Sequence, residues 1–162
     1  MKCKHSAEKC GIIAAVCYKE KQRISRDKTH ETDHTTQEDK TMAKIYVFLA
    51  DGCEEIEGLT VVDIVRRAKL EMTTISITDE KEVTSSHNVT FLTDALASEV
   101  DFDGFDAIVL PGGMPGTLNL GASDMVNKVI KKFAGEGKIV AAICAAPSVL
   151  GAAGLLEGRH AT

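Results

Sequence analysis

Hydrophobic and polar positions divide the chain into two unlike parts near residue 42. Between residues 19 and 41 nearly every position is polar, and Ile24 is the one aliphatic residue. A stretch this polar cannot bury a core of its own. We therefore predict a flexible N-terminal extension over residues 1–41 and a folded domain over residues 42–162.

From Met42 onward, apolar runs alternate with segments of helical periodicity. The apolar runs predict strands over residues 44–50, 72–78, 106–110 and 138–143. Between and after them the pattern predicts a helix over 55–68, two short strands around a turn within 82–92, a helix that starts after Ser123, and a helix over 145–153. Strands that alternate with helices indicate an α/β fold, a doubly wound parallel sheet covered by helices on both faces. The order of the strands in the sheet does not follow from the pattern.

In two of the predicted helices, the spacing of the apolar residues indicates which side chains are buried. In 55–68 we expect Leu59, Val62 and Val65 to form the buried stripe. In the helix after Ser123 the buried positions are expected to be Met125, Val126, Val129, Ile130 and Phe133, with Ser123 and Asp124 capping its start and Gly135 and Gly137 ending it.

Charge and composition exclude several classes of partner. The net charge is −5, whereas nucleic acid and anionic membrane surfaces attract basic proteins, so neither is an expected partner. The apolar runs are far shorter than the roughly 20 residues of a membrane helix. An odd number of widely spaced cysteines does not suggest a disulfide framework, and no cleavage site follows the short apolar stretch near the N-terminus, so we expect a cytoplasmic protein.

One pattern in the extension resembles half of a zinc finger. Twelve residues separate Cys17 from His30, and three separate His30 from His34. However, Cys10 lies too far from Cys17 for the first ligand pair, and the intervening stretch lacks the apolar residues of a finger. We therefore predict no metal site.

Chemically unusual residues follow three of the expected strands, at the edge where parallel sheets carry their sites. Cys144 falls between a strand and a helix, with the small residues Ala142 and Ala146 two positions away on either side. A nucleophile elbow needs small residues at those positions because the turn is tight. The dipole of the following helix favours the thiolate, and the Ala145 N–H is free to bind an oxyanion. A buried structural cysteine is the alternative interpretation.

The other two segments supply glycines and carboxylates. Gly112 and Gly113 allow the backbone a sharp turn and a close approach to a ligand, with the Gly113 N–H as a second oxyanion donor, although they also suit an ordinary turn. Glu54 and Glu55 fit the first turn of a helix, where carboxylates favour the dipole, and Asp51 with Glu54 has the spacing of a capping box. Glu57 lies deeper, where a desolvated carboxyl could be protonated and hydrogen bonded to a thiolate.

Together these segments resemble the ThiJ/PfpI superfamily, in its ThiJ and DJ-one branch. The resemblance rests on KIYVFLADGCEEIEGLTVVDIVRRA, DAIVLPGGMPGTLNL and KIVAAICAAPSVLGAAGLLEG, which occur in the family's order and spacing between Met42 and Thr162. It implies a flavodoxin-like sandwich, no cofactor and, in the full-length protein, a homodimer. It also implies that the domain is incomplete at its C-terminus, because the family continues with further strands and a closing helix.

The resemblance assigns roles to four residues. It implies Cys144 as the nucleophile, Glu57 as the carboxylate hydrogen bonded to it, and Gly113 and Ala145 as the oxyanion donors. The protease-like branch has a histidine directly after its nucleophile, whereas this chain has Ala145, so peptidase activity is not expected. A histidine that helps to shape the site in many members lies beyond Thr162, and His160 does not occupy that position.

Two functions fit these residues. In the first, a cofactor-independent enzyme of the glyoxalase or deglycase type acts on small reactive carbonyls: the Cys144 thiolate adds to an aldehyde while Glu57 moves a proton. In the second, the protein is a non-catalytic oxidative-stress sensor or a holdase-type chaperone in which Cys144 oxidises to a sulfinate. Turnover of methylglyoxal without added thiol distinguishes them.

Overall fold

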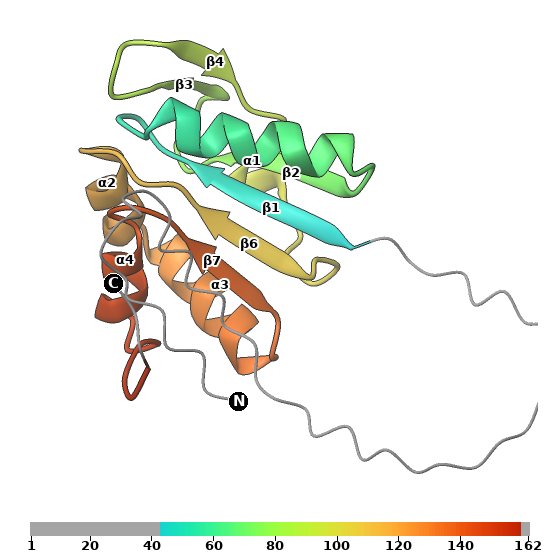
Figure 1. The fold of residues 1–162 in the computed structure, drawn as a ribbon, viewed down its shortest axis with the longest axis vertical. Helices are drawn as coiled ribbons and strands as arrows, with labels where there is room; N and C mark the ends of the chain where they lie inside the picture. The colour runs from blue at the N-terminus through green and yellow to red at the C-terminus, as the bar shows by residue number, and fades with distance from the viewer. Residues whose placement is uncertain (1–42, 160–162) are drawn as a thin grey trace, which may run out of the picture.

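A five-stranded parallel sheet forms the centre of the protein in the computed structural model, which describes residues 43–159. The strands lie in the order β5-β2-β1-β6-β7. Their bounds are β1 Lys44–Leu49, β2 Glu71–Ser76, β5 Ala95–Leu96, β6 Ala107–Leu110 and β7 Ile139–Ala142. Figure 1 shows β1, β6 and the edge strand β7 side by side, with their arrowheads at one end of the molecule. This arrangement confirms the expected α/β class with a mostly parallel sheet.

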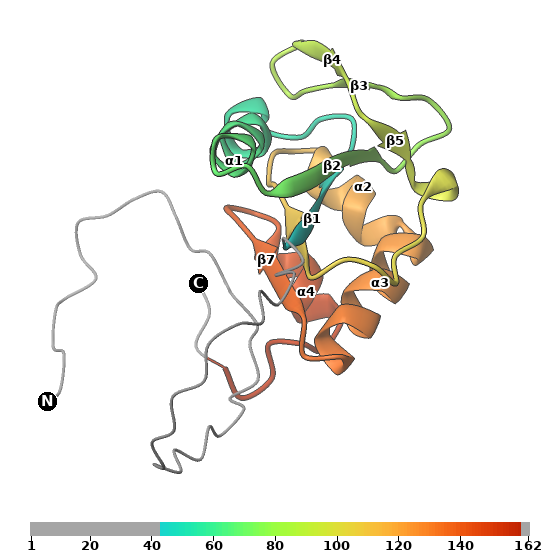
Figure 2. The ribbon, with the colours of Figure 1, turned by 90° about the vertical axis from the view of Figure 1, so that its right-hand side faces the viewer.

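The helices cover both faces of the sheet (Figure 2). α1 (Glu55–Arg67) lies on one face, and α2 (Gly116–Ala122) and α3 (Asp124–Gly135) lie on the other, followed along the chain by the short helix α4 (Pro147–Ala152). An antiparallel hairpin of β3 (Glu82–Thr84) and β4 (Thr90–Leu92) packs on the same core as α1, and a 3₁₀ turn, η1 (Ala97–Glu99), follows β5. The expected strands, the hairpin and three of the helices are present, within a few residues of their expected ends.

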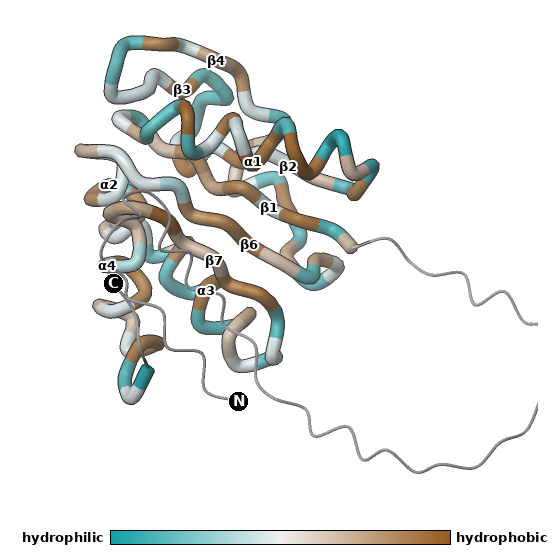
Figure 3. Tube along the Cα trace, viewed as in Figure 1, coloured by the Kyte–Doolittle hydropathy of each residue, from teal (hydrophilic) through white to brown (hydrophobic). Residues whose placement is uncertain are grey.

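β6 and β7 are apolar along their whole length, and β1 is apolar from Ile45 onward, because both faces of these strands are covered (Figure 3). Side chains alternate between two cores. Tyr46 and Phe48 join the larger core beneath α2, α3 and α4, whereas Val47 and Leu49 join a smaller core beneath α1 and the hairpin. The sheet therefore divides the interior of the domain into two cores.

The amphipathic face of α3 is as expected, but that of α1 is not. Val126, Val129, Ile130 and Phe133 of α3 are buried, and the Ser123 side chain accepts a hydrogen bond from the Val126 N–H at the start of the helix. In α1 the buried positions are Gly58 and Val62, whereas Leu59 is 38% exposed, so placing Leu59 on the buried stripe was wrong. Gly58 turns inward because the helix lies close to the sheet there: a Cβ at Gly58 would lie 3.0 Å from Leu49 Cδ2.

α2 was not expected from the sequence. Its sequence, GTLNLGA, contains two glycines and is too short to show a helical period. Gly116 is required at its start because a Cβ there would lie 2.5 Å from the backbone nitrogen of Cys53. A close contact between two loops, rather than helix propensity, therefore fixes the beginning of α2.

Candidate active site

Three loops that follow neighbouring strands meet at one end of the sheet. They are residues 50–54 after β1, residues 111–115 after β6, and residues 143–146 after β7. Backbone hydrogen bonds join the first two loops: the Glu54 N–H donates to the Gly112 carbonyl at 2.9 Å, and the Gly116 N–H donates to the Gly52 carbonyl at 3.0 Å. The edge that was expected to carry the chemistry is therefore a connected set of loops.

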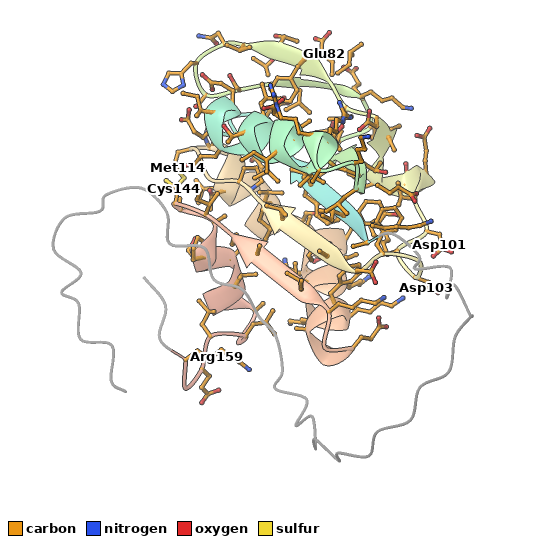
Figure 4. All side chains as sticks on the ribbon, turned by 45° about the vertical axis from the view of Figure 1, so that its right-hand side comes forward. Glu82, Asp101, Asp103, Met114, Cys144 and Arg159 are labelled. Carbon is orange, nitrogen blue, oxygen red and sulfur yellow. The ribbon has the colours of Figure 1, made fainter. Side chains whose placement is uncertain are left out.

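Cys144 occupies the elbow that the sequence predicted. Its φ is +59°, a left-handed conformation that is uncommon for a residue with a side chain. Ala142 and Ala146 are buried on either side, and the Ala146 N–H donates to the Ile143 carbonyl at 3.0 Å, which closes the turn. The side chain of Cys144 itself is exposed, which rules out the alternative of a buried structural cysteine. Figure 4 shows its sulfur at the same end of the molecule as Met114, which is 57% exposed.

Glu57 lies in the first turn of α1 and is half-buried. Its Oε2 accepts a hydrogen bond of 2.8 Å from the Gly112 N–H. Its carboxyl is also hydrogen bonded to the Cys144 thiol, which brings together two residues that lie far apart along the chain. The structure therefore places Glu57 next to Cys144, and the roles that the resemblance gives these two residues stay predictions.

The Cys144 thiol does not have the electrostatics expected from its place before a helix. The hydrogen bond to Glu57 raises the pKa of Cys144 above its usual value, and partial desolvation and the Glu57 charge act in the same direction. α4 is only a short helix and begins at Pro147, beyond the elbow, so its dipole does not outweigh a carboxylate in direct contact. The expectation of a thiol with a lowered pKa was wrong in sign.

The two expected oxyanion donors both face the sulfur. The backbone N–H groups of Gly113 and Ala145 are within hydrogen-bonding reach of Cys144 and oppose the rise in its pKa. Gly113 has a φ of +89°, and a Cβ on it would lie 2.2 Å from the Glu54 nitrogen, so glycine is needed for both conformation and space. An anion formed next to the sulfur would meet two preset N–H donors.

Three other acids near the start of α1 were considered from the sequence, and they have different partners from Glu57. Asp51 Oδ1 accepts from the Thr84 N–H at 2.9 Å, and the helix cap at Glu54 has no side-chain hydrogen bond, so the expected capping box is absent. Glu55 Oε1 lies 3.0 Å from His87 Nδ1, and Glu54 Oε1 lies 3.7 Å from the same nitrogen.

His87 was not considered from the sequence, because nothing in its own segment marks it. The hairpin between β3 and β4 carries it to α1, where the hydrogen bond to Glu55 raises the pKa of His87 and the charges of Glu55 and Glu54 act in the same direction. One ligand atom from each of these three residues lies within 4.8 Å of the others, and they form the one group of this kind in residues 43–159. Ion pairing between the imidazole and the carboxylates accounts for the group, and we assign no metal ion to it.

Gly112 is the site residue whose role the sequence reasoning missed. It was expected to permit a sharp turn and a close approach to a ligand, yet its N–H donates to Glu57 and its carbonyl accepts from the Glu54 N–H. The sequence offers no signal for these contacts, since they depend on how closely α1 approaches the loop after β6.

The N-terminal extension, the zinc-like spacing of Cys17, His30 and His34, and His160 lie outside the described residues. Within residues 43–159, no helix is long and apolar enough to cross a membrane.

Comparison with known proteins identifies relatives that match most of the chain. Protein dj-1beta of Drosophila melanogaster is 37% identical over 116 residues, which are 72% of this chain and 62% of that protein. A deglycase of Thermococcus kodakarensis is 36% identical over 120 residues, which are 74% of this chain and 70% of that protein. The chain thus spans less than two thirds of the fly relative.

Solved structures agree with the sequence relatives. The oxidized DJ-1 of Toxoplasma gondii superposes with a TM-score of 0.69 at 38% identity, over 72% of this chain and 64% of that chain. Drosophila melanogaster DJ-1beta superposes with a TM-score of 0.68 at 36% identity, over 70% of this chain and 61% of that one. The model of the DJ-1/PfpI family matches residues 43–162. The chain therefore belongs to the DJ-1/PfpI family.

Proposed function

We propose that this domain is a cysteine-dependent, cofactor-independent enzyme that acts on small reactive carbonyls of the 2-oxoaldehyde type. The observation that carries the proposal is the Cys144 thiol, exposed on a left-handed elbow, hydrogen bonded to Glu57 and faced by the N–H groups of Gly113 and Ala145. A nucleophile, a proton carrier and oxyanion donors are the groups that carbonyl addition needs. A family relative from Thermococcus kodakarensis carries the name deglycase, which is consistent with this chemistry.

The first step forms a bond between sulfur and the aldehyde carbon. Glu57 accepts the thiol proton as the sulfur attacks, and the carbonyl electron pair moves onto oxygen, next to the N–H groups of Gly113 and Ala145. Return of the proton from Glu57 to this oxygen gives a hemithioacetal. The raised pKa of Cys144 makes this proton acceptor necessary, because little free thiolate is present at neutral pH.

The second stage moves hydrogen within the substrate. Glu57 removes the proton from the carbon attached to sulfur, and the electron pair forms a double bond to the neighbouring carbon, whose carbonyl oxygen takes the negative charge as an enediolate. Glu57 then returns the proton to that neighbouring carbon, while the hydroxyl proton of the sulfur-bearing carbon passes to the enediolate oxygen. The product is a 2-hydroxy thioester, so one carbon is oxidised and the other reduced without an external oxidant. Water then cleaves the thioester to a 2-hydroxy acid and regenerates the thiol.

Conversion of methylglyoxal to lactate without added thiol tests the proposal. We expect Cys144→Ala to lower the rate by at least ~100-fold, because the bond-forming atom is lost. Cys53→Ala is the matched control, since Cys53 is buried in the smaller core, and we expect it to keep the rate within about threefold. Equal rates for Cys144→Ala and the unaltered protein would contradict the proposal.

A redox role for the same thiol is the second candidate, favoured by the exposure of Cys144 next to two N–H donors suited to sulfinate oxygens. A solved relative from Toxoplasma gondii is described as oxidized. If dilute peroxide converts Cys144 to the sulfinate while methylglyoxal is not consumed by any variant, the sensor function is supported and the enzymatic one is not.

A further inference from the structure

Gly112 lies between the two reactive side chains, on the loop that follows β6. It is buried, and its neighbours come from α1 on one side and from the Cys144 elbow on the other. Nothing in its own segment distinguishes it from a turn glycine. Its contacts, however, are with groups that take part in the chemistry proposed above.

The N–H and the carbonyl of Gly112 both form hydrogen bonds to the beginning of α1. The N–H donates to Glu57 Oε2 at 2.8 Å, and the carbonyl accepts from the Glu54 N–H at 2.9 Å. Glu54 caps the helix and Glu57 lies in its first turn. The loop therefore fixes the position of the helix end as well as the orientation of the carboxyl that the helix carries.

Gly112 also has no room for a side chain. A Cβ at this position would lie 2.8 Å from Glu57 Oε2, 2.9 Å from Cys144 Cβ and 3.0 Å from the Ala145 nitrogen. Its φ is not in the left-handed region, unlike that of Gly113, so backbone conformation does not demand glycine here. The requirement is for space between Glu57 and Cys144.

We infer that Gly112 is the positioning residue of the Glu57–Cys144 pair: its N–H orients the carboxyl, and its lack of a side chain lets carboxyl and thiol meet. The inference rests on the proposed function and deepens it, because Gly112 acts through Glu57, the proposed proton carrier. A methyl group at Gly112 moves the carboxyl and the elbow apart and weakens their hydrogen bond.

The rate at which iodoacetamide alkylates Cys144, followed by mass spectrometry as a function of pH, tests the inference. Of the charged side chains described, Glu57 acts most strongly on the thiol, and its hydrogen bond raises the pKa of Cys144. We expect Gly112→Ala to displace the profile toward lower pH, by about one unit, which is roughly a tenfold gain in thiolate at neutral pH. Gly104→Ala is the control, because a Cβ there meets nothing within 4 Å, and its profile should coincide with that of the unaltered protein.

A double variant separates positioning from general structural damage. In a Glu57→Gln background, adding Gly112→Ala should produce no further displacement, because the group through which Gly112 acts is already changed. The same displacement in both backgrounds would overturn the inference, and so would an unmoved profile in a folded Gly112→Ala protein.

A second measurement avoids dependence on the folding of Gly112→Ala. The ¹H–¹⁵N resonance of Gly112 reports the hydrogen bond from its N–H to Glu57 Oε2, so Glu57→Gln should move this resonance and leave that of Gly104 in place. A Gly112 resonance that Glu57→Gln leaves unmoved would overturn the inference. Neither readout needs carbonyl turnover, so loss of turnover in Cys144→Ala with an unmoved Gly112→Ala profile would reject the inference and leave the proposed function intact.

Discussion

At the scale of single residues, the two described cysteines show how surroundings decide the chemistry of a thiol. Cys53 packs with Val47, Leu49 and Val83 in the smaller core, and burial is the largest cause that raises the pKa of Cys53 to about 11. Cys144 is exposed, and its pKa is raised chiefly by a hydrogen bond to a carboxyl. One thiol is protected by packing and the other is controlled by a partner that can accept its proton.

We predict that Cys53 is inert toward alkylation in the folded protein and becomes reactive on unfolding. At about pH 8 a thiol with a pKa near 11 is only ~0.1% ionised, and burial excludes the reagent as well, so Cys53 should react at least ~100-fold more slowly than Cys144. Mass-resolved labelling with and without urea measures both rates. Labelling of Cys53 as fast as that of Cys144 without urea would show that the smaller core is open.

The residue scale also shows what the sequence could and could not predict. The tight elbow at Cys144 was predictable, because small residues flank it and a strand precedes it. The sign of the pKa shift of Cys144 was not predictable, because it depends on the contact with Glu57. Glu57 lies in α1, far from Cys144 along the chain. The role of Gly112 was hidden for the same reason: its contacts arise only when α1 and the elbow are packed together.

At the scale of elements, Asp94 ties α1 to the sheet. Its carboxylate accepts hydrogen bonds from the N–H and hydroxyl of Thr74 in β2, and it pairs with Arg66 near the end of α1 at 2.9 Å. Partial burial tends to raise the pKa of Asp94, but the Thr74 hydrogen bonds and the Arg66 charge outweigh it and lower the pKa. The carboxylate form is therefore the one that stabilises the fold.

We predict that Asp94→Asn lowers the free energy of unfolding by about 1 kcal/mol at neutral pH, a modest value because the ion pair is largely exposed. Because the pKa of Asp94 is lowered in the fold, its contribution is present above the unfolded value near 3.8 and is lost as the pH falls through the folded value. Urea unfolding should therefore show a lower free energy of unfolding for Asp94→Asn than for the unaltered protein at pH 7. This difference between the two proteins should become smaller below about pH 4.

Asp79→Asn serves as the control for this experiment, because Asp79 is exposed and its side chain makes no hydrogen bond or ion pair within residues 43–159. We expect Asp79→Asn to unfold like the unaltered protein at both pH values. A difference for Asp94→Asn that is equal at pH 7 and pH 3 would contradict the assignment to its charge.

Element positions followed from hydrophobic pattern wherever the pattern was long enough to show a period. α3 has five apolar positions at helical spacing and was predictable, whereas α2, with two glycines in seven residues, was not. In α1 the prediction of the buried face was wrong at Leu59. The periodicity indicated a large buried side chain there, but Gly58 is the residue that lies close to the sheet, and Leu59 is exposed.

At the scale of the whole molecule, the order of the strands creates the site. β1, β6 and β7 are neighbours in the sheet although long segments separate them in sequence, so the loops after them meet. The alternation of strands and helices predicted a parallel sheet but not this order, and the family resemblance supplied the pairing of Glu57 with Cys144. The match to residues 43–162 confirms the family, while the share of the fly relative that is spanned, 62%, leaves the activity of the whole protein a proposal.

The central claim is that Cys144 and Glu57 act as one unit that shares a proton, and the pH dependence of Cys144 alkylation in Glu57→Gln tests it most directly. Because the Glu57 hydrogen bond and charge raise the pKa of Cys144, replacing the carboxylate by an uncharged amide of similar size should lower that pKa. We expect the alkylation profile of Glu57→Gln to lie about one unit or more below that of the unaltered protein, with the fold intact by circular dichroism. Superimposable alkylation profiles for Glu57→Gln and the unaltered protein would show that Glu57 does not act on the Cys144 thiol, and would contradict the claim.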